Sequence, residues 1–246
     1  MNSDNVFSSI ADTFTHCFID GDRWKWIVQG LGATLLITFF AAIIGLLLGI
    51  IVAAIRSSYD KNKETMARKG GIGYIVMLIF NALCRFYITV IRGTPVVVQL
   101  LLMYFVFMKS VKAGVIVAIV TFGINSGAYV AEIIRGGIMA VDNGQFEAGR
   151  SLGFNYVQTM RFIIIPQAFK NCLPALCNEI IALLKETSIA GYVGIMELTK
   201  AGDLIRGRTF EAFMPLIVVA IVYLILVMVL AKLLGQLERR FRRSER

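Results

Sequence analysis

Long apolar runs alternate with short polar segments along almost the whole chain. A membrane-spanning helix needs about 20 predominantly apolar residues, and five of the runs reach or exceed that length. The pattern therefore predicts an all-α integral membrane protein with five transmembrane helices. We expect the spans at about residues 27–55, 84–108, 113–134, 174–194 and 213–233.

The apolar stretch at residues 72–108 is too long for one simple span, and the polar sequence Arg92-Gly-Thr-Pro95 interrupts it. We expect residues 72–83 to lie along or enter the inner interface, although they could instead extend the second span. We expect the second span to bend near Pro95, because proline lacks the N–H that continues a helix.

The composition agrees with a membrane protein and argues against nucleic-acid binding and metal binding. Of the 246 residues 57% are hydrophobic and the mean hydropathy is +0.74, whereas soluble domains are about 45–50% apolar. The net charge of +9 comes from basic residues in the polar segments, so membrane topology explains it and no nucleic-acid partner is expected. The four cysteines form no Cys-x-x-Cys pair and there is one histidine, so no metal site is expected.

The basic residues also indicate the orientation, because cytoplasmic segments of membrane proteins are enriched in Lys and Arg. With the N-terminus outside, the predicted inner segments hold fifteen basic residues and the outer segments seven. We therefore expect the N-terminus outside and the C-terminus in the cytoplasm. The chain then divides into an extracytoplasmic segment (1–26), a transmembrane domain (27–233) with a cytoplasmic loop at 135–173, and a basic cytoplasmic tail (234–246).

One stretch of the cytoplasmic loop, from Glu147 to Pro166, is amphipathic and lies between long apolar runs. Gly153 can adopt the left-handed conformation that ends a helix. Pro166 ends or kinks a helix, because it has no N–H and clashes with the preceding turn. The stretch therefore predicts a short helix, a glycine turn and a second helix that stops before the proline. Such a helix–turn–helix at the membrane face can dock into a partner protein.

The spacing of this stretch is Glu-Ala-x, three residues, Gly, nine residues, Ile-x-hydrophobe-Pro, and it resembles the coupling motif of binding-protein-dependent ABC importer permeases. Gly149 departs from the motif, where alanine is usual, and we expect it to weaken the first helix by about 1 kcal/mol. The resemblance implies contact with a cytoplasmic ATPase through Gln145, Glu147, Ala148, Gly153, Ile163 and Pro166.

Polar side chains also occur within three of the predicted spans, although a charged group at the bilayer centre costs roughly 2.5–3.5 kcal/mol. Such groups normally face a bundle interior or a watery path. Pairing of the charges with each other, to hold the bundle together, is the structural alternative. We interpret one set as candidates for a substrate path: Gln99, Asn125, Tyr129, Asn178, Lys185, Glu186, Thr187 and Ser188. A second set is interpreted as structural or gating: Arg92, Thr94, Pro95 and Glu132.

Further motifs match the same class of protein, among them Arg92-Gly-Thr-Pro95, Pro166-Gln-Ala168 and Leu184-Lys-Glu-Thr-Ser188. Together they resemble the permease subunits of polar amino-acid ABC importers, the histidine/glutamine/arginine/cystine type. The resemblance implies a type I importer fold in the bacterial cell membrane, with two permeases, two ATPases that bind ATP and Mg, and an external solute-binding protein. It leaves open which amino acid is carried, and whether the two permeases are copies of one chain.

No Gly-Lys pair occurs in the chain, so no Walker-type nucleotide loop and no enzymatic activity of its own are expected. The alternative function is an ion-coupled carrier or channel for small polar solutes that works alone, with Glu and Lys inside the membrane relaying protons. Such a protein needs no coupling loop, and five spans without an inverted repeat fit it poorly. Transport by the chain without an ATPase would distinguish the two.

Overall fold

The computed structural model describes residues 10–243, apart from the side chains of residues 64, 65, 69, 242 and 243. Within this part of the chain every regular element is helical, which confirms the all-α prediction. The first nine residues of the predicted N-terminal segment and the last three of the predicted tail lie outside the described residues. The elements in chain order are η1 (Thr15–Ile19), η2 (Asp20–Asp22), α2 (Trp24–Lys69), α3 (Ile72–Gly93), α4 (Val96–Leu102), η3 (Met103–Phe107), α5 (Gly114–Met139), α6 (Asn143–Ser151), α7 (Tyr156–Thr159), η4 (Met160–Ile164), α8 (Ile165–Glu186), η5 (Thr187–Val193), α9 (Leu198–Thr209) and α10 (Phe213–Arg243).

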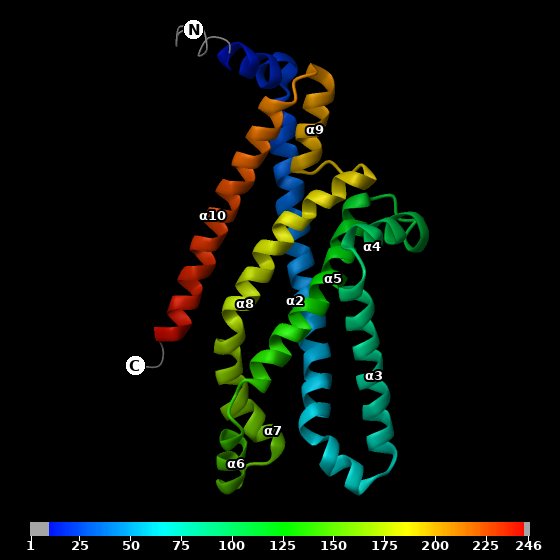
Figure 1. Ribbon diagram of the computed structural model, residues 1–246, viewed down its shortest axis with the longest axis vertical. Helices are drawn as coiled ribbons and strands as arrows, with labels where there is room; N and C mark the ends of the chain where they lie inside the picture. Colours follow the sequence, from blue (N-terminus) through cyan, green and yellow to red (C-terminus); the bar gives the residue numbers. More distant parts are fainter. Residues whose placement is uncertain (1–9, 244–246) are drawn as a thin grey trace.

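The first span, α2, is a longer helix than the sequence predicted. Its 46 residues, at 1.5 Å each, extend about 69 Å, more than twice the roughly 30 Å of a bilayer's hydrocarbon core. Residues 56–69, predicted to be a polar loop, continue the helix because they contain no glycine or proline. The helix ends at Gly70, whose φ of 61° suits only glycine well. The polar end of α2 therefore projects beyond the bilayer, toward the end of the bundle that carries α6 and α7 (Figure 1).

The second apolar stretch folds differently from the prediction. α3 is one continuous helix, so residues 72–83 form its first half, and this helix is long and apolar enough to cross a membrane. Residues 84–108, the predicted second span, therefore do not form one continuous helix, because α3 ends at Gly93 and α4 begins at Val96. Thr94 is extended (φ −122°, ψ 145°), because a following proline disfavours the helical conformation. After Pro95, α4 and η3 turn away from the axis of α3 (Figure 1).

The centre of the bundle is the contact between α2 and α5, and small residues bring the two helices close together. A Cβ atom at Gly45 would lie 3.0 Å from the Cβ of Ser126, and a Cβ at Gly49 would overlap Val130. Of the described helices that could span a membrane, α5 is the most buried and α10 the least. Of the two substrate-path candidates on α5, Asn125 is buried and Tyr129 is partly buried.

The fourth predicted span corresponds to α8 followed by η5, which together run alongside α2 and α5 (Figure 1). Polar residues are spread along α8. Among the described residues, the helices long and apolar enough to cross a membrane by themselves are α2, α3, α5 and α10. The five-span count therefore stays a prediction that depends on the packing of α8 within the bundle.

The predicted polar connection before the last span is the helix α9. Fully buried Glu197 caps it, and its carboxylate accepts hydrogen bonds from the backbone N–H of Thr199 (2.7 Å) and of Lys200 (2.6 Å). Burial raises the pKa of Glu197, while these bonds act in the opposite direction. The hydroxyl of Thr34 on α2 accepts from Leu198 N at 3.2 Å, so α9 is fixed to the first span.

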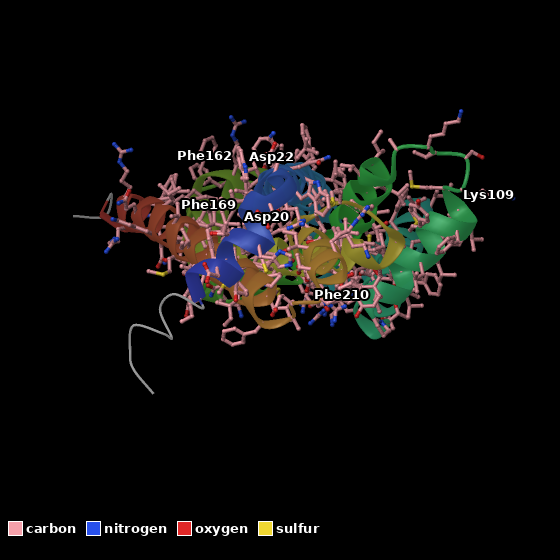
Figure 2. All side chains as sticks on the ribbon, turned by 90° about the horizontal axis from the view of Figure 1, so that it is seen from above. Asp20, Asp22, Lys109, Phe162, Phe169 and Phe210 are labelled. Atoms are coloured by element: carbon pink, nitrogen blue, oxygen red, sulfur yellow. The ribbon has the colours of Figure 1, made fainter. Side chains whose placement is uncertain are left out.

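The connections between the helices gather at two ends of the bundle, as the predicted topology requires. η1, η2 and the loop between α9 and α10 lie at one end, and the α2–α3 turn, α6 and α7 lie at the other, while the loop after η3 lies at the side of the bundle nearer the first end (Figure 1). Viewed along the bundle from the first end, Asp20, Asp22 and Phe210 lie over the helices and Lys109 lies at the side of α4 (Figure 2). Which end faces outward stays a prediction from the charge distribution.

Candidate functional site

The predicted helix–turn–helix is present and forms a hairpin at residues 142–164, here called the coupling hairpin. Its first helix, α6, begins where the side chain of Asp142 accepts from Gly144 N at 2.6 Å. Gly153 has φ +81°, the left-handed conformation that the sequence predicted for the turn. The second helix begins with a capping box, in which Asn155 and Gln158 each accept the other's backbone N–H at 2.9 Å. Both ends of the turn are therefore fixed by local hydrogen bonds.

Pro166 does not end the second helix, in contrast to the prediction. The helical path continues from α7 through η4 into α8, and Pro166 lies in the first turn of α8. η4 is a π-helical turn, whose wider spacing lets the chain pass a residue that has no N–H to donate. The hairpin is consequently joined to α8 without a break.

Gly149, the departure from the motif, has a packing role that the sequence did not reveal. A Cβ at this position would lie 2.7 Å from Cγ2 and 2.8 Å from Oγ1 of Thr159 on the facing helix. Thr159 is buried, and its hydroxyl donates to the carbonyl of Asn155 at 3.0 Å, so it has little room to move. The glycine allows α6 to lie directly against the second helix of the hairpin.

The hairpin is attached to the bundle from two sides. Ile164 is fully buried and packs with Ile138 and Val141 at the end of α5, with Ile163 against the same cluster. On the other side, Lys61 of the α2 extension contacts α6. Its Nζ donates to Asn143 Oδ1 at 2.8 Å and lies 4.4 Å from the ring centre of Phe146.

The outer surface of the hairpin remains open and carries large apolar side chains. Leu152 is 71% exposed and Phe162 is 61% exposed. Glu147 and Ala148, two of the predicted coupling residues, are exposed as well, and Gln145 Oε1 accepts from Gln167 at 3.3 Å. Exposed apolar residues beside polar ones, on a rigid helical pair, are typical of a protein-docking surface.

Among the membrane-embedded candidates, Gln99 and Asn125 form one network with the break between α3 and α4. Gln99 Nε2 donates to the carbonyl of Ile91 (2.8 Å) and to the carbonyl (3.1 Å) and hydroxyl (2.9 Å) of Thr94. Asn125, which is buried, donates to Gln99 Oε1 at 3.0 Å. Thr94 in turn donates to the carbonyl of Val90 at 2.8 Å. These bonds satisfy groups at the end of α3 that the helix itself cannot.

Glu132 belongs to an ion-pair cluster that joins α5 to α2. Arg135 contacts it through Nε at 3.3 Å and Nη2 at 2.9 Å, and Arg56 lies 3.8 Å away. Arg135 also pairs with Asp60 at 3.4 Å. Glu132 is therefore paired with basic side chains of its own helix and of α2. Arg92, by contrast, lies over the ring of Tyr129, 5.2 Å from its centre.

The candidates on α8 and η5 are placed differently from one another. The hydroxyls of Thr187 and Ser188 donate to carbonyls of their own helix, at 2.7 and 2.8 Å. Lys185 and Asn178 are exposed and Glu186 is half-buried. Within the described part of the chain, none of these last three side chains takes part in a hydrogen bond or an ion pair closer than 4 Å.

A further carboxylate, Glu179, was not selected as a site residue from the sequence. Its Oε1 accepts from the buried hydroxyl of Ser126 at 2.8 Å, which links α8 to α5. It also lines an apolar groove between α2, α8 and α10. Its spacing of seven residues from Glu186, which places both at similar positions around α8, was the available signal.

A bundle of apolar helices that carries an exposed helical hairpin and buried polar groups is typical of an integral-membrane transport permease. Residues 71–243 match the family described as the binding-protein-dependent transport system inner membrane component, and the chain belongs to this family. Its place in a cell membrane as a multi-pass component follows.

Similar proteins can be aligned with this chain over almost their whole length. The arginine transport system permease protein ArtQ of Bacillus subtilis is 34% identical over 223 residues, 89% of this chain and 94% of the relative. The glutamine transport system permease protein GlnP of Escherichia coli K12 is 36% identical over 220 residues, 88% and 93% respectively. A chain in the crystal structure of an amino acid ABC transporter with histidines has a TM-score of 0.75 and 41% identity, covering 88% of this chain and 94% of that one. The predicted fold, that of a type I ABC importer permease, is confirmed.

Proposed function

We propose that this chain is the permease subunit of an ATP-driven importer of polar amino acids. The family supplies the class, and the names of the relatives, which refer to arginine and glutamine transport, support the kind of cargo. The single observation that carries the coupling assignment is the hairpin, which is fixed to the bundle at its base and exposes Leu152 and Phe162 at its surface.

The partners follow from this assignment. A cytoplasmic subunit binds ATP and Mg and docks on the coupling hairpin through the region of Gln145, Glu147 and Ala148. An extracytoplasmic solute-binding protein delivers the amino acid at the opposite end of the bundle, and a second permease completes the path across the bilayer. The chain itself supplies no nucleotide site and carries out no covalent chemistry.

The path from the hairpin to the membrane interior is continuous. Helical backbone extends without interruption from Tyr156 to Val193, so a displacement of the hairpin is transmitted along α8 to η5. Transport by alternating access requires that the ATPase contacts differ between two states of the permease. A continuous helical segment from the docking surface to the proposed transport path would carry such a difference to the membrane interior.

For the substrate path we propose the α8 residues Asn178, Lys185 and Glu186. A free amino acid carries an ammonium and a carboxylate, and these three side chains offer a carboxylate, an ammonium and an amide as partners. Gln99 and Asn125 are instead engaged with each other and with the end of α3. They hold the α3–α4 break in place beside the path.

Reconstitution into liposomes tests the proposal. Uptake should require the ATPase, ATP and the binding protein together, and the chain alone should be inactive. Leu152→Glu should prevent copurification of the ATPase, because it places a charge on the docking surface. Phe210→Glu is the matched control, since Phe210 is also an exposed apolar residue (93%) but lies at the opposite end. Uptake by the chain alone would instead favour an ion-coupled carrier.

A further inference from the structure

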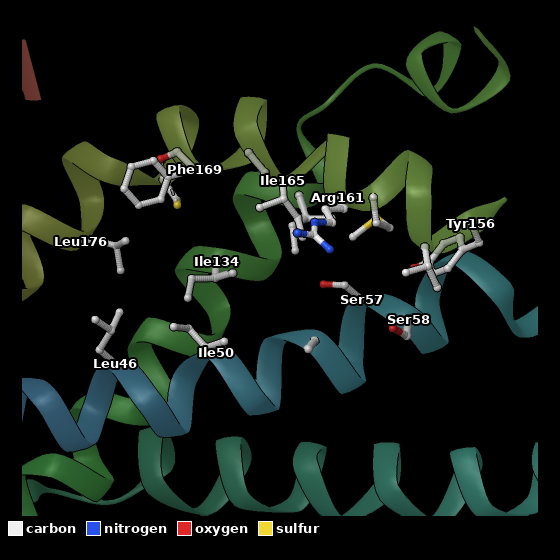
Figure 3. Close-up of a pocket in the computed structure, with 16 residues that line it drawn as sticks. Leu46, Ile50, Ser57, Ser58, Ile134, Tyr156, Arg161, Ile165, Phe169 and Leu176 are labelled. Carbon is white, nitrogen blue, oxygen red and sulfur yellow. Dashed lines mark hydrogen bonds between the residues drawn. The ribbon is translucent and has the colours of Figure 1, made fainter. Parts of the chain in front are cut away.

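A cavity of about 570 Å³ lies between α2, α5, the second helix of the coupling hairpin and the first half of α8 (Figure 3). The part nearest the middle of the bundle is lined by hydrocarbon, including Leu46, Ile50 and Leu176. The part beside the hairpin holds the polar side chains of the cavity, Ser57, Ser58, Tyr156 and Arg161, among apolar ones such as Val157 and Met160. The cavity is therefore mainly apolar, and its few polar side chains gather at the hairpin end.

Two hydroxyl groups in the polar part have no partner among the described residues. Ser57 is 1% exposed and its Oγ forms no hydrogen bond, and the hydroxyl oxygen of Tyr156 is buried without a hydrogen bond. Ser57 is on α2 and Tyr156 is on the hairpin, so they belong to different walls of the cavity (Figure 3). Buried polar groups are nearly always hydrogen-bonded, and two such groups in one cavity indicate a polar guest between them.

The charge at this end is positive. Arg161 is exposed at the mouth of the cavity, and within the described residues no carboxylate forms an ion pair with it. Its described neighbour is the ring of Phe162, 5.6 Å away. No acidic residue lines the cavity, so nothing there would bind the ammonium of a zwitterionic headgroup. A guanidinium fork and hydroxyl donors suit a phosphate group.

The cavity is elongated. From Leu46 to Ser58 it follows twelve residues of α2, about 18 Å, so an extended hydrocarbon chain can lie along this helix.

We propose that this cavity binds an anionic phospholipid from the leaflet on the hairpin's side of the membrane. The phosphate lies among Arg161, Ser57 and Tyr156, and an acyl chain extends along α2 toward Leu46. Basic pockets between transmembrane helices are suited to anionic headgroups. The lipid joins the first span to the coupling hairpin. The inference requires only that the chain lies in a membrane and holds for any cargo.

Lipid analysis of the assembled transporter tests this directly. The complex is reconstituted in equal amounts of phosphatidylglycerol and phosphatidylcholine and re-extracted, and retained lipids are counted by mass spectrometry. Phosphatidylglycerol should be retained in preference. Arg161→Gln should lower its retention about fivefold, the effect expected for one basic residue at a membrane surface. Arg161→Lys should keep most of it, and Arg150→Gln, the same charge change elsewhere in the hairpin, should have no effect.

A second variant examines the apolar half. Ile50→Trp fills the acyl part of the cavity and should reduce retention although Arg161 is intact. Unchanged retention in Ile50→Trp would mean that only a phosphate is held, and would overturn the lipid assignment. Equal retention of both lipids by the unmodified protein would overturn it too. So would crosslinking of a photoreactive residue at position 50 to the second permease in place of lipid.

Discussion

Asn125 on α5 donates a side-chain N–H to Gln99 Oε1 at 3.0 Å. Gln99 in turn donates from Nε2 to the carbonyl of Ile91, close to the end of α3. One buried contact thus fixes the position of α4 relative to two membrane-spanning helices. The pair has the residue types expected of a substrate site, but its hydrogen bonds are already used within the protein.

Substitutions in the Gln99–Asn125 pair should therefore lower the stability of the folded protein, and any loss of transport should follow from that. Gln99→Leu leaves the amide of Asn125 and the carbonyl of Ile91 without partners, and should destabilise the protein by about 1–3 kcal/mol. Asn125→Leu should cost a similar amount, and the double variant less than the sum. Thermal unfolding of the four proteins in one detergent measures this. Additive losses, or lost uptake at unchanged stability, would contradict the structural role.

Gly149 should not tolerate the alanine that is usual at its position in the motif. Gly149→Ala brings a methyl against Thr159 and should destabilise the hairpin by about 1–3 kcal/mol. Thr159→Ala in the same chain should recover most of this loss. Gly136→Ala is the matched control, because a Cβ there meets nothing within 4 Å and should be harmless. Equal unfolding temperatures for Gly149→Ala and Gly136→Ala would contradict the packing role of Gly149.

Gly153 sets the turn of the hairpin through its φ of +81°. Proline fixes φ near −65°, so Gly153→Pro should disrupt the turn and separate ATP hydrolysis from uptake. Gly153→Asn should be much milder, because asparagine tolerates the left-handed conformation. The ratio of amino acid transported to ATP hydrolysed is the measurement. Normal coupling in a well-inserted Gly153→Pro protein would remove the hairpin from the coupling route.

Glu186 should contribute to selectivity. Glu186→Gln removes a negative charge without changing the shape of the side chain, so uptake of cationic amino acids should fall by about tenfold or more, the loss expected for a hydrogen bond to a charged group. Neutral amino acids should be affected less. Ser188→Ala is a suitable control, since that hydroxyl bonds only to its own helix. If Glu186→Gln and Asn178→Leu both leave uptake and selectivity intact in an assembled complex, the proposed path is wrong.

The orientation can be tested by labelling single introduced cysteines with a membrane-impermeant reagent. Cysteines at Asp12 and Asp203 should react from outside, and those at Lys63 and Arg240 only from inside. The background should be low, because the native cysteines are buried and burial raises the pKa of the Cys17 thiol, which reduces the reactive thiolate. The reverse pattern would overturn the charge-based orientation.

Much of the fold could be predicted because apolar length and glycine chemistry are local signals. The span predicted at 113–134 is α5, the span at 213–233 lies within α10, and Gly153 forms the expected turn. The prediction was wrong where polar residues continue a helix, as in residues 56–69 of α2, since hydropathy marks only where a helix leaves the membrane and not where it ends.

The partners of the polar residues could not be predicted, because periodicity places a residue on a face but does not say what lies opposite. Glu132 was found from its position in a span, yet its partner Arg56 lies in what was expected to be a loop. Gln99 was interpreted as a substrate-path candidate, and its contact with the end of α3 could not be foreseen because it depends on how the break at Pro95 folds. Gly149 was seen as a weakness of α6 because Thr159 could not be placed against it.

The π-helical turn before Pro166 has a geometric consequence. Each residue of an α-helix advances the chain by about 100° around the axis, and a π turn accommodates one residue more than an α turn. The docking surface of the hairpin is therefore rotated by about 100° from where an unbroken α-helix would place it relative to Asn178 and Glu186. Removing the extra residue of this turn would change the angle between the hairpin and the rest of α8. The number of residues in the turn before Pro166 thus sets the side of α8 on which an ATPase bound to the hairpin would act.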